Sequence, residues 1–174
     1  MKNQIKWLET NRLIISHPSP SDYSNFLKLT NNEKVSDYIT HGKNPKDIQN
    51  VLSWLINHYE VHGFSAGPIY LKDTETFIGR VGLIYQKYND EDKLCIIYHL
   101  LPEYWNKGYA SEAVKSVLSY GFNKLNSQKI FALINKKNTS SIKLIEKIRA
   151  KPIIEKCNGN SKVIVYEIVN DFYK

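Results

Sequence analysis

The sequence predicts an α/β fold in one domain, with a mixed sheet of about six to seven strands and about four flanking helices. Its 174 residues suit one domain that is large enough to bury a core. Short runs rich in β-branched residues alternate along the chain with segments of helical periodicity. We see no internal repeat, low-complexity tract or linker, so residues 1–174 are predicted to form a single domain.

The strand predictions rest on length, residue type and the residues that bound each apolar run. The run from Leu94 to Leu101 is too short and too rich in β-branched residues for a helix, which predicts a buried strand. Pro102 ends this strand because proline has no N–H to donate. Asn158-Gly159 predicts a hairpin near the C-terminus. The predicted strands are residues 12–16, 68–71, 77–85, 94–101, 129–135, 153–157 and 163–169.

The helix predictions rest on apolar residues at helical spacing between capping residues and helix breakers. Ser21 or Asp22 can cap the first helix, and Gly63 ends the second. A loop at residues 40–45 separates these two helices. The predicted helices are a segment holding Tyr23, Phe26, Leu27 and Leu29, followed by residues 47–62, 110–122 and 138–147.

The strand, glycine turn and helix between residues 94 and 122 form the layout of an anion site. A helix N-terminus has backbone N–H groups without partners and partial positive charge, so phosphate binds there. Gly108 permits unusual dihedral angles, Ala110 keeps the approach open and Lys107 adds a cation. The segment is neither a Walker loop nor a three-glycine dinucleotide motif. The alternative is that Gly108 merely starts an amphipathic helix.

Residues 102–113, PEYWNKGYASEA, closely resemble the acetyl-CoA-binding motif of the GNAT superfamily, in the ribosomal-protein N-terminal acetyltransferase (RimJ/RimL-like) branch. Further matches are Thr10-Asn11-Arg12-Leu13, Phe77-Ile78-Gly79 and residues 138–147, in the family's order and over nearly the whole chain. The resemblance implies the GNAT fold, a splayed strand pair at the cofactor site, and acetyl-CoA as co-substrate. It also implies that the first two helices and their loop form one wall of the acceptor site.

The expected cofactor-binding residues follow from this resemblance together with the strand break at Pro102. If the central strand splays beyond Leu100, its unpaired backbone groups can pair with the amides of pantetheine. Asn138 is a natural helix cap, and by resemblance it also contacts CoA. The expected cofactor-binding residues are Leu100, Lys107, Gly108, Tyr109, Ala110, Ser111 and Asn138.

The expected catalytic residues are Ser141 and Glu155. By resemblance Ser141 faces the sulfur and stabilises the leaving thiolate; the alternative is an ordinary first-turn helix residue. Many family members carry Glu where this chain has Cys95, so that candidate base is missing. Within the branch, a Glu three residues before the Asn-Gly turn is the favoured base, and Glu155 stands there. Its alternative is an exposed carboxylate in a lysine-rich strand.

Four further positions shape these expectations. Tyr98 and Tyr166 are expected to be core or pocket aromatics rather than acids. Asn106 replaces a family glycine and tolerates left-handed dihedral angles. Arg149 replaces the glycine that usually ends the last helix, and we expect that turn to be rebuilt because arginine is a poor left-handed cap.

The net charge of +7 is concentrated in one segment. Residues 124–162 hold ten Lys or Arg and two acids, a balance of +8, which leaves −1 for the rest of the chain. The common explanation is a solvated basic face; the functional one is attraction of the phosphates of CoA, of nucleic acid or of an acidic protein. Nucleic acid ranks low because the chain has no aromatic-interleaved motif and no basic recognition helix.

Composition and localisation signals point to a cytoplasmic protein without a metal. Hydrophobic residues make up 42% and charged residues 24% of the chain, no apolar run could span a bilayer, and the N-terminus lacks a signal-peptide core. We therefore expect no membrane partner. Cys95 and Cys157 lack a metal-ligand spacing and are expected to be plain thiols.

The predicted function is acetyl transfer from acetyl-CoA to a primary amine, first a protein or peptide N-terminus and next a small amine. A polycationic acceptor would require an acidic cleft, and the net positive charge of this chain argues against such an acceptor. One alternative is a CoA-binding sensor or interaction module that no longer catalyses, which the missing acid at Cys95 and the change at Arg149 support. A nucleic-acid-binding protein is the third alternative. A homodimer stays open, since no stripe in the sequence identifies an interface.

Overall fold

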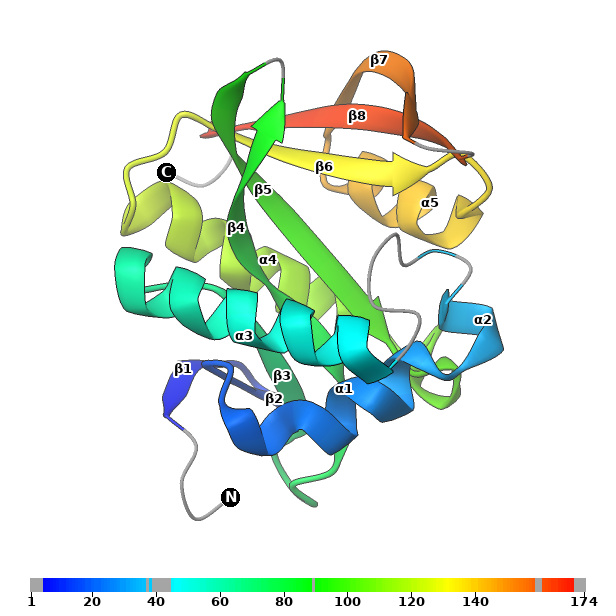
Figure 1. Cartoon of the computed structure of the whole chain (residues 1–174). Coiled ribbons are helices and arrows are strands. Elements are labelled where there is room, and N and C mark those ends of the chain that lie inside the picture. The colour runs from blue at the N-terminus through cyan, green and yellow to red at the C-terminus, as the bar shows by residue number, and fades with distance from the viewer. Residues whose placement is uncertain (1–4, 37, 39–44, 89, 159–160, 171–174) are drawn as a thin grey trace. The chain divides into compact units, whose positions relative to one another are not determined.

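The computed structural model describes the chain except residues 1–4, 37, 39–44, 89, 159–160 and 171–174 (Figure 1). Short 3-10 turns occur at Pro20–Asp22 and Pro102–Tyr104. The strands and helices, in chain order, are β1 Lys6–Glu9, β2 Leu13–Ser16, α1 Tyr23–Thr30, α2 Glu33–Ser36, α3 Pro45–His62, β3 Ala66–Leu71, β4 Phe77–Tyr88, β5 Glu91–Leu100, α4 Tyr109–Asn123, β6 Lys129–Asn135, α5 Thr139–Lys147, β7 Lys151–Asn158 and β8 Ser161–Val169.

The strands form a mixed sheet in the order β1-β2-β3-β4-β5-β6-β8-β7. The pair β5 and β6 is parallel, whereas β2–β3, β6–β8 and β7–β8 are antiparallel. This confirms the predicted α/β class with a mixed sheet. The eight strands of the described residues slightly exceed the expected six to seven. The additional elements are β1 and α2, each of four residues and too short to give a periodic pattern.

The chain divides into two compact units. The first comprises residues 1–84 and 97–117, and the second comprises residues 85–96 and 118–174. In the first unit, helices α1 and α3 lie side by side (Figure 1). The backbones of β4 and β5 approach closely at Gly79, where an added Cβ would lie 2.2 Å from the carbonyl oxygen of His99. Only glycine fits at this point.

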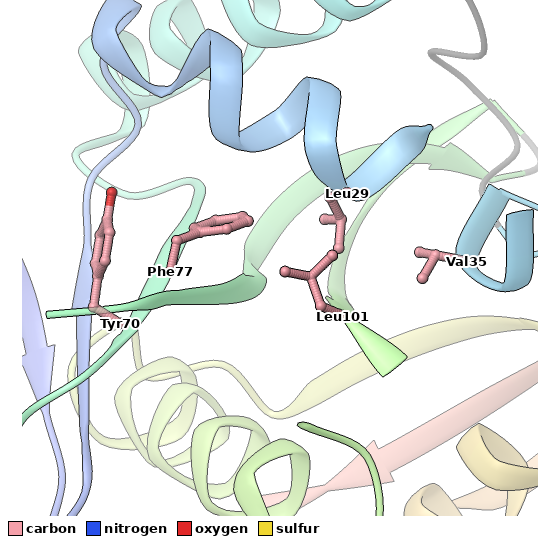
Figure 2. Close-up of a cluster of buried hydrophobic side chains, with 5 residues drawn as sticks. All are labelled: Leu29, Val35, Tyr70, Phe77 and Leu101. Atoms are coloured by element: carbon pink, nitrogen blue, oxygen red, sulfur yellow. The ribbon is translucent and has the colours of Figure 1, made fainter. Parts of the chain in front are cut away.

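A cluster of buried side chains fixes the C-terminal end of β5 in the first unit. Leu29 of α1 points toward Leu101, which directly follows β5, and Val35 of α2 lies beyond them (Figure 2). Tyr70 of β3 and Phe77 of β4 complete the cluster. The backbone N–H of Leu101 also donates to the carbonyl oxygen of Ile78, 2.9 Å away. Burial of these side chains holds the segment that leads into the predicted anion site.

The second unit contains β6, β8 and β7 with helix α5. The strands β6 and β8 pair along their length, from Lys129 opposite Val169 to Asn135 opposite Val163. The predicted C-terminal hairpin is confirmed by β7 and β8, which pair as far as Asn158 opposite Ser161. Residues 159 and 160 of its turn lie outside the described residues. The predicted loop at 40–45 likewise lies largely outside them.

Candidate functional site

The turn before α4 has the backbone conformation that the sequence predicts. Gly108 has φ +80° and Asn106 has φ +59°, so both residues adopt left-handed conformations. Helix α4 starts at Tyr109, and the N–H of Glu112 donates to the carbonyl oxygen of Gly108, 3.1 Å away. Tyr109, Ala110 and Ser111 therefore lie in the first helical turn. Their N–H groups have no carbonyl partner four residues earlier within the helix.

A carboxylate in this helical turn binds the segment that precedes β2. Glu112 accepts hydrogen bonds from the Thr10 hydroxyl at 2.6 Å, the Arg12 backbone N–H at 2.9 Å and Arg12 Nε at 2.7 Å. Burial disfavours the charged carboxyl, but these hydrogen bonds outweigh burial and lower the pKa of Glu112. The contacts join residues about 100 positions apart in the sequence. They fix the first turn of α4 to the rest of the unit.

Arg12 also places a cation beside the glycine turn. Its Nη1 donates to the carbonyl oxygen of Lys107 at 3.0 Å, and its guanidinium lies 4.4 Å from the centroid of the Tyr109 ring. A Cβ added to Gly108 would lie 3.3 Å from Arg12 Nη2. Gly108 therefore leaves space directly beside a guanidinium and a helix N-terminus. These are the groups that bind phosphate.

The end of β5 is held by an indole as well as by the sheet. Trp105 Nε1 donates to the carbonyl oxygen of Leu100, 2.7 Å away. This bond occupies one of the two acceptor positions of that oxygen. A ligand amide that pairs with this carbonyl shares the oxygen with the indole of Trp105.

In the second unit, Asn138 caps helix α5 as predicted. Its side-chain oxygen accepts a hydrogen bond from the backbone N–H of Ser141, 3.0 Å away. Ser141 is the third residue of α5 and is half-buried. The capping role of Asn138 is confirmed. The cap uses the side-chain oxygen, so the amide nitrogen is the group left for a ligand contact.

Glu155 forms an exposed ion pair. Lys136 Nζ donates to both carboxylate oxygens, at 2.7 and 2.9 Å, and each side chain is 51% exposed. The structure thus shows the exposed strand carboxylate that the sequence left as the alternative. Lys136 must release the carboxylate before Glu155 can accept a proton from a substrate.

The Cys95 thiol and the Tyr166 hydroxyl are poor proton carriers at neutral pH. Burial raises the pKa of the Cys95 thiol to about 12, although the charge of Lys156 opposes the shift. Burial also raises the pKa of Tyr166 to about 12, helped by its hydrogen bond to Glu146. Cys95 does not replace the acid that many family members carry, and Tyr166 is a core aromatic as expected.

The expectation that the turn at Arg149 would be rebuilt is wrong. Arg149 adopts φ +65°, the left-handed conformation that a glycine would have. Its N–H donates to the carbonyl oxygen of Glu146, and the N–H of Ala150 donates to that of Ile145, so the helix end keeps its hydrogen bonds. Burial of Ile145, Ile148 and Ala150 around the turn supplies the stabilisation that offsets the backbone strain.

Comparisons with known proteins agree with this geometry. A family model described as an acetyltransferase (GNAT) domain matches residues 12–151. The chain belongs to the GNAT family. The uncharacterized N-acetyltransferase YoaA of Bacillus subtilis (strain 168) is 31% identical over 148 residues, which cover 81% of this chain and 80% of YoaA.

Solved structures are similar over almost the whole GNAT chain. An acetyltransferase (GNAT family) from Bacillus anthracis is 27% identical with a TM-score of 0.77, covering 96% of this chain and 98% of that one. A ribosomal-protein-S5-alanine acetyltransferase from Vibrio fischeri has a TM-score of 0.76 over 96% of this chain and 98% of its own. At 17% identity, that likeness concerns the fold alone.

This GNAT protein is an N-acetyltransferase with acetyl-CoA as co-substrate and an amine as acceptor. The turn at Gly108 fits the phosphates of that co-substrate, because an added Cβ would fill the space beside Arg12. In the described part of the chain, no group of three or more His, Cys, Asp or Glu side chains could hold a metal ion. Nor is any described helix long and apolar enough to cross a membrane.

Sequence reasoning missed Thr10, Arg12 and Glu112 as parts of this site. The structure brings these residues together with Lys107 to Tyr109 in the first unit. Asn138 and Ser141 meet in the second unit, where Glu155 is instead bound to Lys136. The available signal was that both Thr10-Asn11-Arg12-Leu13 and Ser111-Glu112-Ala113 lie in segments that resemble the family. Periodicity could not show that these segments touch.

Proposed function

We propose that this N-acetyltransferase acts in the cytoplasm on the N-terminal amine of a protein or peptide. The glycine turn beside Arg12 carries the co-substrate half of the proposal. The acceptor half is supported by the sequence resemblance to the ribosomal-protein N-terminal branch. It is further supported by the fold likeness to the Vibrio fischeri protein, which is named as a ribosomal-protein-S5-alanine acetyltransferase.

In this proposal the first turn of α4 binds the phosphates of acetyl-CoA, which when bound supplies an activated acetyl thioester. The N–H groups of Gly108, Tyr109, Ala110 and Ser111 donate to phosphate oxygens, and Lys107 adds a cation. The backbone of Leu100 pairs with the pantetheine amides at the end of β5, five residues beyond the point where Cys95 of β5 lies opposite Phe131 of β6.

The second unit supplies the remaining groups. The amide nitrogen of Asn138 donates to the co-substrate while its oxygen caps α5. The Ser141 hydroxyl donates a proton or hydrogen bond to the departing sulfur. Lys136 first releases the Glu155 carboxylate, and Glu155 then accepts a proton from the attacking amine. Binding and positioning supply most of the rate enhancement, because an amine attacks a thioester with little covalent help.

The test measures CoA release with a C-terminally amidated peptide that begins with Ala and contains no Lys. The control is the same peptide with its N-terminus already acetylated, and a panel of small amines forms the third arm. The proposal predicts turnover of the free peptide, none of the blocked peptide and slower turnover of small amines. Faster turnover of a small amine would contradict the proposed acceptor.

The same assay distinguishes the second candidate, a CoA-binding sensor, which the protonated Cys95 and the Lys136-bound Glu155 favour. A sensor binds acetyl-CoA and releases no CoA with any acceptor. If Glu155 is the base, Glu155→Gln lowers kcat by roughly 100-fold or more while acetyl-CoA binding is unchanged. An unchanged kcat assigns Glu155 to the exposed ion pair alone.

A further inference from the structure

A buried cation in the first unit lies outside the glycine turn and is not among the expected cofactor-binding residues. Arg80 is the fourth residue of β4 and is only 5% exposed. Its guanidinium lies 5.5 Å from the centroid of the Phe26 ring of α1. Burial lowers the pKa of Arg80 to about 10, which still leaves the side chain positively charged at neutral pH.

Among the described residues, the side chain that hydrogen-bonds to Arg80 carries no charge. Arg80 Nε donates to Nδ1 of His99 on β5, 3.4 Å away. Burial and then the charge of Arg80 lower the pKa of His99 to about 3, against an opposing hydrogen bond with the Tyr38 backbone. The imidazole is therefore neutral. In the part of the chain that the structure describes, no Asp or Glu forms an ion pair with Arg80.

This situation is uncommon, because arginine is rarely buried without an anionic partner. Arg12 in the same unit shows the usual arrangement, since it is bound by the carboxylate of Glu112. Arg80 is more deeply buried than Arg12, yet its charge is uncompensated by the described residues. Desolvating such a cation destabilises the fold unless an anion from elsewhere pairs with it.

The position of Arg80 suggests where that anion comes from. Its neighbour Gly79 packs against His99 and Leu100 so closely that an added Cβ would lie 2.8 Å from Leu100 Cα. Leu100 is the proposed contact of the co-substrate amides. On its other side, Arg80 meets Phe26 of α1, and His99 meets Tyr38 after α2. The cation thus lies beside the end of β5 and against α1, one of the helices expected to form the acceptor wall.

We propose that Arg80 binds a carboxylate that the acceptor carries close to its amine. This inference rests on the proposed acetyl transfer and adds the chemical class of the acceptor. His99 engages Nε, so the two terminal nitrogens of Arg80 keep the planar geometry that binds both oxygens of a carboxylate. The carboxylate belongs either to an acidic residue among the first two of a peptide or to a free amino acid.

The experiment compares matched acceptors in the native chain, Arg80→Lys and Arg80→Gln. The peptide pair is Ala-Asp against Ala-Asn at the N-terminus of an otherwise identical amidated peptide, and the small-molecule pair is alanine against alaninamide. The native chain is expected to prefer the acidic peptide or the free amino acid by roughly 10- to 100-fold in kcat/KM, the range for a charged hydrogen-bonded pair. The preference identifies which of the two sources supplies the carboxylate.

The preference ratio is measured within each variant, so a loss of folded protein does not change it. Arg80→Gln is expected to abolish the ratio, mainly through KM, and Arg80→Lys to keep part of it because a point charge remains. Equal rates for both members of each pair in the native chain would overturn the proposal. So would an unchanged ratio in Arg80→Gln.

A binding measurement separates this proposal from the proposed function. N-acetyl-Ala-Asp and N-acetyl-Ala-Asn peptides are titrated calorimetrically into the native chain with CoA present. Tighter binding of the acidic product, lost in Arg80→Gln, supports the carboxylate site even if no acceptor is turned over. Equal binding of the two products overturns it, whereas absence of turnover alone overturns only the acetyl-transfer assignment.

Discussion

Helices α4 and α5 begin in opposite ways. At α4 the residue before the helix is Gly108, which has no side chain to cap the helix, and the cations Lys107 and Arg12 lie nearby. At α5 the preceding residue is Asn138, whose own oxygen accepts the N–H of Ser141. The first turn of α4 therefore keeps its donors for an anion, whereas α5 satisfies one of its donors locally.

The two helix starts also differ in what holds them. The Asn138 cap spans three residues and forms wherever the helix forms. The start of α4 is held by Glu112, which binds Thr10 and Arg12 at the far end of the sequence. A helix N-terminus that binds a ligand lacks its own cap, and here contacts from a distant segment replace that stabilisation.

The substitution with the largest expected effect tests whether the N-terminus of α4 binds the co-substrate. Gly108→Arg should lower acetyl-CoA affinity by roughly 100-fold or more, because it blocks two or more charge-assisted hydrogen bonds to phosphate. Gly63→Arg is the matched control, since Gly63 also has a left-handed φ, of +75°, but has open space around it. Acetyl-CoA affinity is measured by calorimetric titration. Equal losses of affinity in both variants would mean that backbone strain, and not a blocked phosphate site, causes the loss.

The next effect concerns the contact that holds α4. Glu112→Gln removes the charge that binds Arg12, so acetyl-CoA affinity should fall by roughly 3- to 10-fold and the free energy of unfolding by about 1 kcal/mol. Glu103→Gln, at an exposed carboxylate in the preceding turn, should change neither quantity. An equal effect at Glu103 would mean that general negative charge, rather than this contact, matters.

The same contact predicts a pH dependence of stability. The pKa of Glu112 is lowered in the folded chain, so its contribution is complete above the ordinary value of 4.5. It is lost as the pH falls through the lower folded value. Chemical denaturation of native and Glu112→Gln proteins should therefore give free energies of unfolding that converge in acid. A constant difference at every pH would contradict this assignment.

The smallest effect separates the two roles of Asn138. Asn138→Ala should lower the free energy of unfolding by about 1 kcal/mol, the usual value of an N-cap. Asn138→Asp keeps the capping oxygen and should leave stability unchanged, but it removes the amide donor proposed to contact acetyl-CoA. If Asn138→Asp binds acetyl-CoA with native affinity, Asn138 is a cap alone.

The features that the sequence predicts correctly are local ones. Gly108, Asn106 and the Asn138 cap were predictable because their conformations depend on neighbouring residues. Strand β1 was missed because Lys6–Glu9 is a short, half-exposed strand without an apolar pattern. The boundaries of β6 were predicted correctly because its apolar run ends in polar residues on both sides.

The features that the sequence does not predict depend on contacts between distant segments. Glu112 and Arg12 lie in motifs that are each visible, yet nothing local shows that they meet. Arg149 keeps a left-handed turn because buried neighbours stabilise it. Arg80 would be expected at the surface from its residue type, but the first eight residues of β4 are all buried. Burial of whole strand segments overrides residue preference at that position.

The most direct measurement is a titration of isotope-labelled native protein with CoA, in which backbone amide resonances are followed by NMR. The difference between the two helix starts predicts that the amides of residues 108–111 show large shifts as phosphate accepts their hydrogen bonds. The N–H of Ser141, already bonded to Asn138, should shift much less. Large shifts at Ser141 with none at residues 108–111 would contradict the assignment of α4 as the phosphate-binding helix.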